Sequence, residues 1–433
     1  MFKSTLSSFS NLLVENWSPE FLESSTITFR ANTKIALNNF STFKMSYEKA
    51  ISKFFNENFP DPAEARRKQL WIAEQINLAL DLFWEPLARV AEQLKSEPYQ
   101  EFFSTTSKLG DVLEEFKSNT DDLFGESTRN LVDKILIYFD KTTRIHRYPY
   151  TDIAMIGIPY RVLTDDPKKR KTWMPIVHEL GHHIYWNMAG YFDLEAQKKA
   201  FEKGILDRQK NHHSLPDNIR NLIKPWMEEI FVDAVATRIS GKGDVERQEF
   251  LASSKELILR KSDNEKTNLS IDDGDHVPDG LRLLVSLTSL GASDPIAEWK
   301  SFLQDDVGKK PDEIEFDLKD ENGDFVSNKI KATEVAEHIC NTVNLILTDI
   351  GEYKKGNESL FKIQTSQSTP TEIANKLLET AIKQGNNNPM DILAIVLSPE
   401  VLEGGAGGTS HTHKRVWQSA NGHTHSDSAT HVG

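Results

Sequence analysis

The spacing of apolar residues in the first third of the chain predicts helices. Within residues 31–55, 62–94 and 130–139, apolar side chains recur every three or four positions, the period of one helix face. Such stripes are typical of helices that pack together through their apolar faces. We therefore expect residues 1–147 to form a helical N-terminal domain.

Residues 148–300 show a mixture of patterns. Residues 151–159 form a short apolar run that ends at a proline, which predicts a strand. Helical periodicity follows at residues 173–186, in a pair of helices within 193–224, after Trp226 and at 281–290. We expect this part of the chain to fold as one domain.

Residues 301–400 predict a small α+β region. Apolar and polar residues alternate at 314–318, an Asn-Gly pair favours a two-residue turn, and residues 325–330 would return as the second strand of a hairpin. Helical periodicity resumes at residues 333–347 and 371–383. A glycine-rich stretch then leads into residues 401–433, a polar tail with several histidines that we expect to be flexible.

Charge and composition narrow the possible partners. The 433 residues include 51 basic and 65 acidic side chains, so the formal net charge is −14. This charge disfavours nucleic acid or an anionic membrane surface as a partner. No segment approaches the roughly 18 consecutive apolar residues of a membrane span, and we expect no signal peptide. The single cysteine, Cys340, excludes an intramolecular disulfide, and we expect a cytoplasmic protein.

A five-residue motif, His178-Glu179-Leu180-Gly181-His182, carries the strongest chemical signal. On a helix, residues four apart share a face, so the two imidazoles would converge on one point and bind a metal ion there. Glu179 would lie beside that ion, where a carboxylate takes a proton from a bound water. Gly181 lowers the helix propensity, for which close packing of another backbone would be a reason. The pattern is typical of zinc hydrolases.

Residues 228–236 supply candidate carboxylates for the same site. Glu229 and Asp233 lie four residues apart and therefore share a helix face. Glu229 would be the third metal ligand, and Asp233 would orient a ligand histidine. Glu228 is the competing candidate, but the residue one turn after it is Val232, which offers no carboxylate. We therefore prefer Glu229.

The H-E-x-x-H motif followed by E-x-x-x-D resembles the gluzincins, the thermolysin-like clan of zinc peptidases. The resemblance implies that His178, His182 and Glu229 bind one zinc ion. It also implies that Glu179 is the general base and that Asp233 orients a ligand histidine. The fold would be mostly α (α+β): a zincin-like catalytic core with a small sheet, between the helical N-terminal domain and the α+β C-terminal region.

The same resemblance gives the strand within residues 151–159 a possible role. Gluzincins carry an edge strand at this place, and an extended peptide substrate pairs with it. The residues that would form this edge are Ala154, Met155, Ile156 and Gly157. An ordinary buried core strand explains the apolar run equally well.

A second motif follows at His276-Val277-Pro278, with Arg282 four residues later. It resembles the His-Pro and Arg element of the CAAX-protease-like and stress metallopeptidases. By that resemblance His276 would stabilise the oxyanion formed during hydrolysis, and Arg282 would anchor the loop or a substrate group. The alternative for His276 is a loop histidine bonded to its acidic neighbours.

These observations predict a zinc metallopeptidase that acts on a peptide or protein substrate. One alternative is a catalytically silent zincin-like domain that serves as a binding or scaffold module. Retention of Glu179 argues against silence, because zinc binding alone needs only the three ligands. Another alternative is a zinc amidohydrolase that acts on a non-peptide amide, which the same ligands would support.

Overall fold

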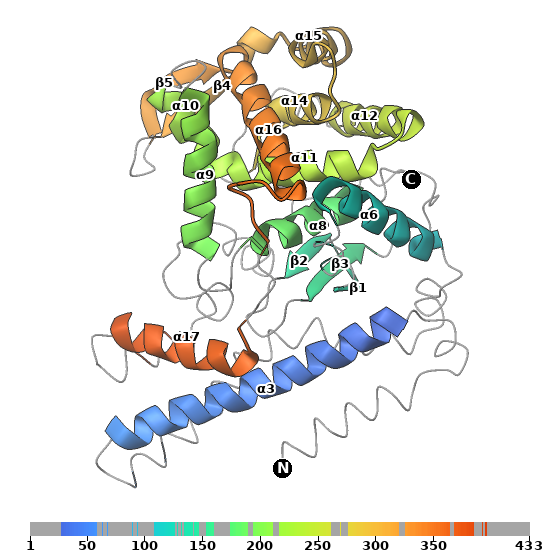
Figure 1. The fold of residues 1–433 in the computed structure, drawn as a ribbon. Helices are drawn as coiled ribbons and strands as arrows, with labels where there is room; N and C mark the ends of the chain where they lie inside the picture. The colour runs from blue at the N-terminus through green and yellow to red at the C-terminus, as the bar shows by residue number, and fades with distance from the viewer. Residues whose placement is uncertain are drawn as a thin grey trace, which may run out of the picture.

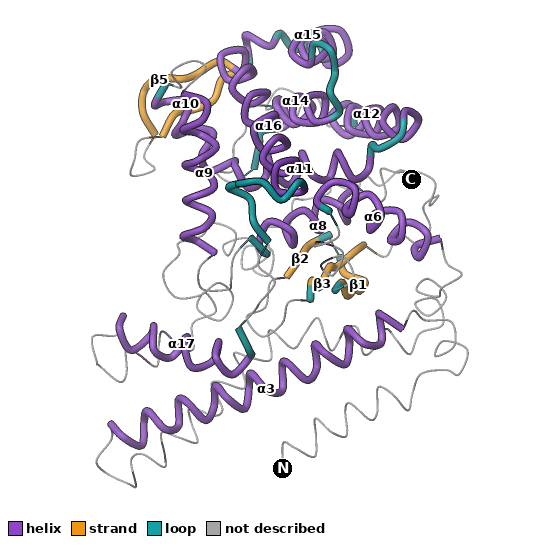
Figure 2. Tube along the Cα trace, in the orientation of Figure 1, coloured by secondary structure: helices purple, strands orange, loops and turns teal. Residues whose placement is uncertain are grey.

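The computed structural model describes the greater part of the chain between residues 27 and 395. The described ranges are 27–58, 108–125, 134–141, 143–146, 153–159, 174–188, 194–210, 216–260, 276–319, 325–363 and 368–384, with a few isolated positions. Most of these residues lie in helices, and the strands form two small sheets (Figure 2). The expectation of a mostly helical protein with a small sheet is confirmed.

Helix α11 (Met227–Ser240) lies at the centre of the helical body (Figure 1). It is buried along almost its whole length because four neighbouring helices pack around it. These are α6 (Lys108–Phe124), α8 (Met174–Trp186), α14 (Asp279–Ser289) and α16 (Ala332–Lys354). Its apolar side chains face several neighbours at once, as in a helix that the core encloses, and the acidic residues of its first turns are buried with them.

The remaining helices extend this body. Helices α9 (Leu194–Lys210) and α10 (Asp217–Ile223) form the pair expected within 193–224. The short 3-10 turn Lys224–Trp226 joins α10 to α11. Beyond α11 lie α12 (Asp244–Leu259), α15 (Pro295–Ser301), the π-helical segment Phe302–Val307 and the 3-10 turn Pro311–Glu313.

A second group of helices lies apart from this body. Helix α3 (Ile27–Asn58) packs against α17 (Pro370–Gln384), so segments from the two ends of the described chain lie side by side (Figure 1). Both helices were expected from their apolar periodicity, and both are confirmed. The helix predicted at 62–94 lies almost entirely outside the described residues.

The hairpin predicted in the C-terminal region is present. It consists of β4 (Glu315–Lys319) and β5 (Phe325–Lys331), which pair in antiparallel fashion. The Asn-Gly turn between them and the tail at 401–433 lie outside the described residues. The helix predicted to follow is α16, in which Cys340 is buried.

A three-stranded sheet lies between α8 and α3 (Figure 1). Its strands are β1 (Ile135–Asp140), β2 (Arg144–His146) and β3 (Ala154–Pro159), in the order β1-β3-β2. The helix predicted at 130–139 is therefore wrong at its C-terminal end. Residues 136–139 are four consecutive buried apolar residues, a pattern that a strand buried on both faces shares with a helix segment.

The edge-strand interpretation of β3 is also wrong. Strand β3 pairs in parallel with β1 along its whole length and in antiparallel fashion with β2 from Met155 to Gly157. Its backbone groups are therefore occupied on both sides over Met155, Ile156 and Gly157, and Ala154 pairs with Ile135 of β1. All six of its residues are buried. The alternative, a buried core strand, is the one observed.

The sheet also crosses the domain boundary that we expected between residues 147 and 148. Strands β1 and β2 precede that boundary and β3 follows it, yet the three share one hydrogen-bonded sheet. Likewise α16, from the expected C-terminal region, packs against α14 of the expected catalytic domain. In the described part of the chain, no helix is both long and apolar enough to cross a membrane.

Candidate metal centre

Helices α8 and α11 carry the candidate ligands and lie in direct contact. Pro175 lies in the first turn of α8, where its missing N–H costs little. Gly181 faces α11, and a Cβ at this position would come within 2.9 Å of Val232 Cγ1 and 3.2 Å of the Val232 carbonyl oxygen. The glycine therefore allows the two helices to approach closely, as its place in the motif had suggested.

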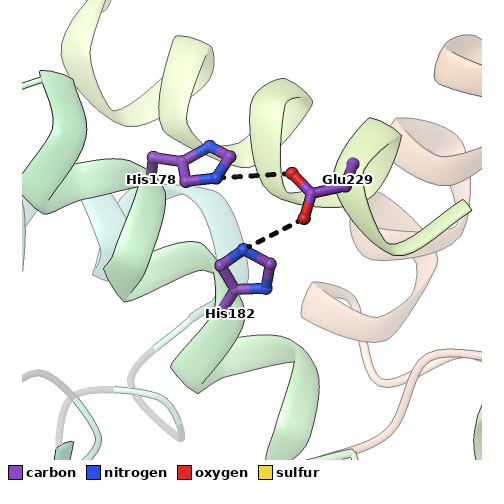
Figure 3. A group of neighbouring side chains, drawn as sticks. All are labelled: His178, His182 and Glu229. Carbon is purple, nitrogen blue, oxygen red and sulfur yellow. Dashed lines mark ion pairs between the residues drawn. The ribbon is translucent and has the colours of Figure 1, made fainter. Parts of the chain in front are cut away.

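Three side chains from these helices converge on one point (Figure 3). His178 Nε2 lies 3.4 Å from one carboxylate oxygen of Glu229, and His182 Nε2 lies 3.5 Å from the other. The two imidazole rings are nearly perpendicular, at 82°. One ligand atom from each of the three residues lies within 4.8 Å of the other two, so the group could hold a metal ion.

Two of the distances in this group are close to those between ligand atoms around a shared ion. Ligand atoms about 2.0–2.1 Å from a tetrahedral metal are separated from one another by about 3.4 Å. The two separations of 3.4 and 3.5 Å agree with that value. They are longer than the roughly 2.9 Å of a good N–H···O hydrogen bond. Two imidazoles and one carboxylate are also the ligand set of a known class of catalytic zinc site.

His178 is oriented by a carboxylate on α11. Its Nδ1 lies 3.0 Å from Asp233 Oδ1, and since an ionised carboxylate only accepts, Nδ1 is the protonated nitrogen. Arg282 on α14 donates two hydrogen bonds to Asp233, from Nε at 3.0 Å and from Nη2 at 2.7 Å. This arrangement directs His178 Nε2 towards Glu229, the role that the sequence suggested for Asp233.

His182 is oriented by a second carboxylate, which sequence reasoning missed in this role. Its Nδ1 lies 3.0 Å from Glu228 Oε1, and Trp186 Nε1 donates to the same oxygen at 2.8 Å. Lys198 on α9 donates to Glu228 Oε2. Glu228 had been weighed only as a metal ligand. Its position directly before Glu229 places its side chain about 100° around the helix, but no local pattern in the sequence shows that it meets His182 and Lys198.

The pKa shifts in this group come from the opposite charges that lie close together in it, the carboxylates, the imidazoles and the cations Arg282 and Lys198. Burial disfavours the charged form of His178, but the hydrogen bond to Asp233 and the attraction of the Glu229 carboxylate outweigh it and raise its pKa to about 10. Burial alone would raise the pKa of Glu229, but the nearby His182 and His178 lower it to about 2. The carboxylates of Asp233 and Glu228 also have pKa values below their usual range, despite burial. The group therefore favours positive charge at its centre.

Glu179 has the opposite shift. Burial raises the pKa of its carboxyl above the ordinary value, and the opposing influence of His182 and His178 does not cancel the effect. Its carboxyl is close enough to interact with Glu229 and His276 as well. A carboxyl whose pKa is raised is better matched to proton transfer near neutral pH than an ordinary one.

The motif that contains His276 and Arg282 also contributes side chains to the site. His276 Nε2 lies 3.8 Å from Glu229 Oε1, and its side chain is 36% exposed, so it lies at the open side of the group. Pro278 is the N-cap of α14, and Arg282 follows in the first turns of that helix. The guanidinium of Arg282 contacts Asp233, so it ties the start of α14, and with it the segment that carries His276, to α11.

Comparison of the chain with family models, with curated proteins and with solved structures found no match.

Proposed function

We propose that this protein is a zinc-dependent metallopeptidase with a gluzincin-like metal centre. The observation that carries the proposal is the facing arrangement of His178, His182 and Glu229. Each histidine Nε2 lies opposite one Glu229 oxygen, at 3.4 and 3.5 Å, and one ligand atom from each of the three residues lies within 4.8 Å of the other two. Glu179 follows His178 directly, and its carboxyl interacts with both imidazoles. A site that only bound metal would not need this fourth group.

The chemistry follows from the residues around the ion. His178, His182 and Glu229 would hold the zinc ion, which would supply Lewis acidity that activates a water molecule and polarises the substrate carbonyl. Glu179 takes a proton from the attacking water while the oxygen of that water bonds to the carbonyl carbon of the substrate. The same carboxyl then gives the proton to the departing amine nitrogen, which breaks the C–N bond.

His276 completes the proposed reaction. It lies at the exposed side of the group, 3.8 Å from Glu229, where a substrate carbonyl would enter. A donor at this place stabilises the negative charge that develops on the carbonyl oxygen. Strand β3 is not part of the proposal, because both of its edges are paired. Peptide recognition would therefore use other residues around the metal centre.

The test compares the wild type with E179Q in a cleavage assay on a broad peptide library. We expect the wild type to cut peptides and E179Q to bind the same amount of zinc but lose cleavage. E57Q, an exposed position on α3, serves as a control and should cleave normally. A wild type that holds zinc but cuts no peptide would support the silent binding module, or the amidohydrolase if it hydrolyses other amides.

A further inference from the structure

The two histidines of the metal centre are held by two separate clusters of the same composition. His178 contacts Asp233, which contacts Arg282. His182 contacts Glu228, which contacts Lys198. In each cluster both carboxylate oxygens are engaged, and each carboxylate is matched by one cation.

The cation that accompanies each orienting carboxylate determines how much negative charge surrounds a bound metal ion. A buried carboxylate without a cation is costly, and one close to a metal ligand also adds negative charge to the site. Because each orienting carboxylate has its own cation, the two clusters add no net charge. Glu229 is then the only carboxylate ligand in the three-residue group that is left to balance a divalent ion.

Lys198 comes from an element that carries none of the motifs. It lies on α9, the first helix of the pair between the two ligand helices in sequence, and it is separated from Glu228 by 30 residues. Its side chain is only 14% exposed and that of Glu228 only 9%. The ammonium also lies 5.6 Å from the centre of the Tyr185 ring on α8, within the range of a cation–π contact. The lysine is therefore enclosed between α8 and α11.

We propose that Lys198 is a positioning residue of the metal centre, which holds Glu228 against His182 and so fixes the second imidazole. The inference rests on the proposed metal site. Trp186 and His182 both contact Oε1 of Glu228, whereas Lys198 contacts Oε2. Without the lysine, Oε2 would be buried without a cation, and the carboxylate would turn away from His182 to reach solvent. Helix α9 would then be part of the metal centre rather than an unrelated insertion.

The test measures zinc affinity by competition with a chelator and the visible spectrum of the protein loaded with Co²⁺. Removal of a group that orients a metal ligand costs about 10–100-fold in affinity. We expect K198M to lose about 10-fold and to change the Co²⁺ bands, and K198R to recover most of the loss. The matched control is K203M, an exposed position on the same helix, which should match the wild type.

A double variant separates the proposed role from general damage to the fold. If Lys198 acts through Glu228, K198M combined with E228Q should bind zinc no more weakly than E228Q alone. This double variant removes both charges together, so it leaves no lone buried carboxylate and keeps the test decisive even if K198M alone folds poorly. If the losses of zinc affinity in K198M and E228Q add up in the double variant, or if K198M binds zinc as tightly as the wild type, the role of Lys198 is wrong. The proposed function would be unaffected by either result. A wild type that binds no zinc would overturn both this inference and the proposed function.

Discussion

Gly181 on α8 lies directly against Val232 on α11, and the space between them does not admit another carbon. A Cβ on Gly181 would lie 2.9 Å from Val232 Cγ1 and 3.2 Å from Val232 Cα. Along α11, Val232 follows Glu228 and Glu229 and directly precedes Asp233, so this contact lies beside the carboxylates of the site. The close approach of these two helices is thus what brings the histidines within reach of Glu229.

The first prediction concerns this contact. We expect G181A to lower the free energy of unfolding, because overpacking costs about 1–3 kcal/mol and exceeds the gain in helix propensity of about 1 kcal/mol. Zinc affinity should fall as well, since α8 must move away from α11. Gly351 on α16 is the matched control, because a Cβ there meets no atom within 4 Å. Chemical denaturation should show G351A unchanged or stabilised, and a stabilised G181A would contradict the packing argument.

The second prediction concerns the cluster around His178. We expect D233A to weaken zinc binding by about 10–100-fold, because His178 loses the partner that fixes its protonated nitrogen. R282K should show a smaller loss, since a lysine ammonium cannot make the two-point contact of the guanidinium. R260M removes an exposed arginine on the C-terminal side of α12 and should bind zinc as the wild type does. Chelator competition measures all three, and unchanged affinity in D233A would show that Asp233 does not orient the ligand.

The third prediction separates the two roles open to His276. We expect H276A to retain its zinc, because His276 is not one of the three clustered ligands. Peptide cleavage should fall by about 10²–10³-fold if the imidazole stabilises the oxyanion. The variant is compared with the wild type by zinc content and by kcat/KM on the same peptide. Normal cleavage would support a simple loop histidine, and loss of zinc would make His276 a ligand.

The fourth prediction concerns the pH dependence of the stability that Asp140 gives to the three-stranded sheet. Asp140 at the end of β1 accepts hydrogen bonds from Arg89 at 2.7 Å and from Arg144 at 2.6 Å. Burial alone would raise the pKa of Asp140, but the Lys141 N–H and the two arginines together lower it below the ordinary value. Its contribution to stability is therefore fully present above the unfolded-state pKa of about 3.9 and is lost as the pH falls through the lower folded-state pKa.

Denaturation of D140N at several pH values tests this relationship. We expect D140N to be less stable than the wild type at pH 7 by roughly 2 kcal/mol, and the gap to narrow below about pH 4, where the wild-type carboxylate takes up a proton. D317N, in an exposed pair with Lys329 on the hairpin, should differ little from the wild type at any pH. A gap that stays constant down to pH 2 would refute the assigned role of the Asp140 charge.

Local patterns in the sequence predicted the helices of the site and the residues that meet there. His178 and His182 lie on one face because the helix period requires it, and Glu229 and Asp233 share a face for the same reason. The position of Gly181 suggested the close helix contact, which is present. The shared faces depend only on residues within one or two helical turns, whereas the meeting of the two helices was predicted from the metal-ligand residue types that both segments carry.

Features that depend on distant parts of the chain could not be predicted. A buried run such as residues 136–139 fits a helix or a strand equally well until its neighbours are known. Whether β3 is an edge depends on β1 and β2, which lie outside its own pattern. Glu228 was misjudged because its partner Lys198 is 30 residues away on another helix. Hydrogen-bonded pairs of this kind leave no periodic signal in the sequence.

The zinc content of purified E229A and E228A, compared with that of the wild type, tests the central claim most directly. Both variants keep the histidine-containing tail, so zinc bound there would appear equally in all three proteins. We predict about one zinc per chain in the wild type, its loss in E229A, and its retention with weaker affinity in E228A. Loss of zinc in E228A with retention in E229A, or equal zinc in all three, would contradict the site formed by His178, His182 and Glu229.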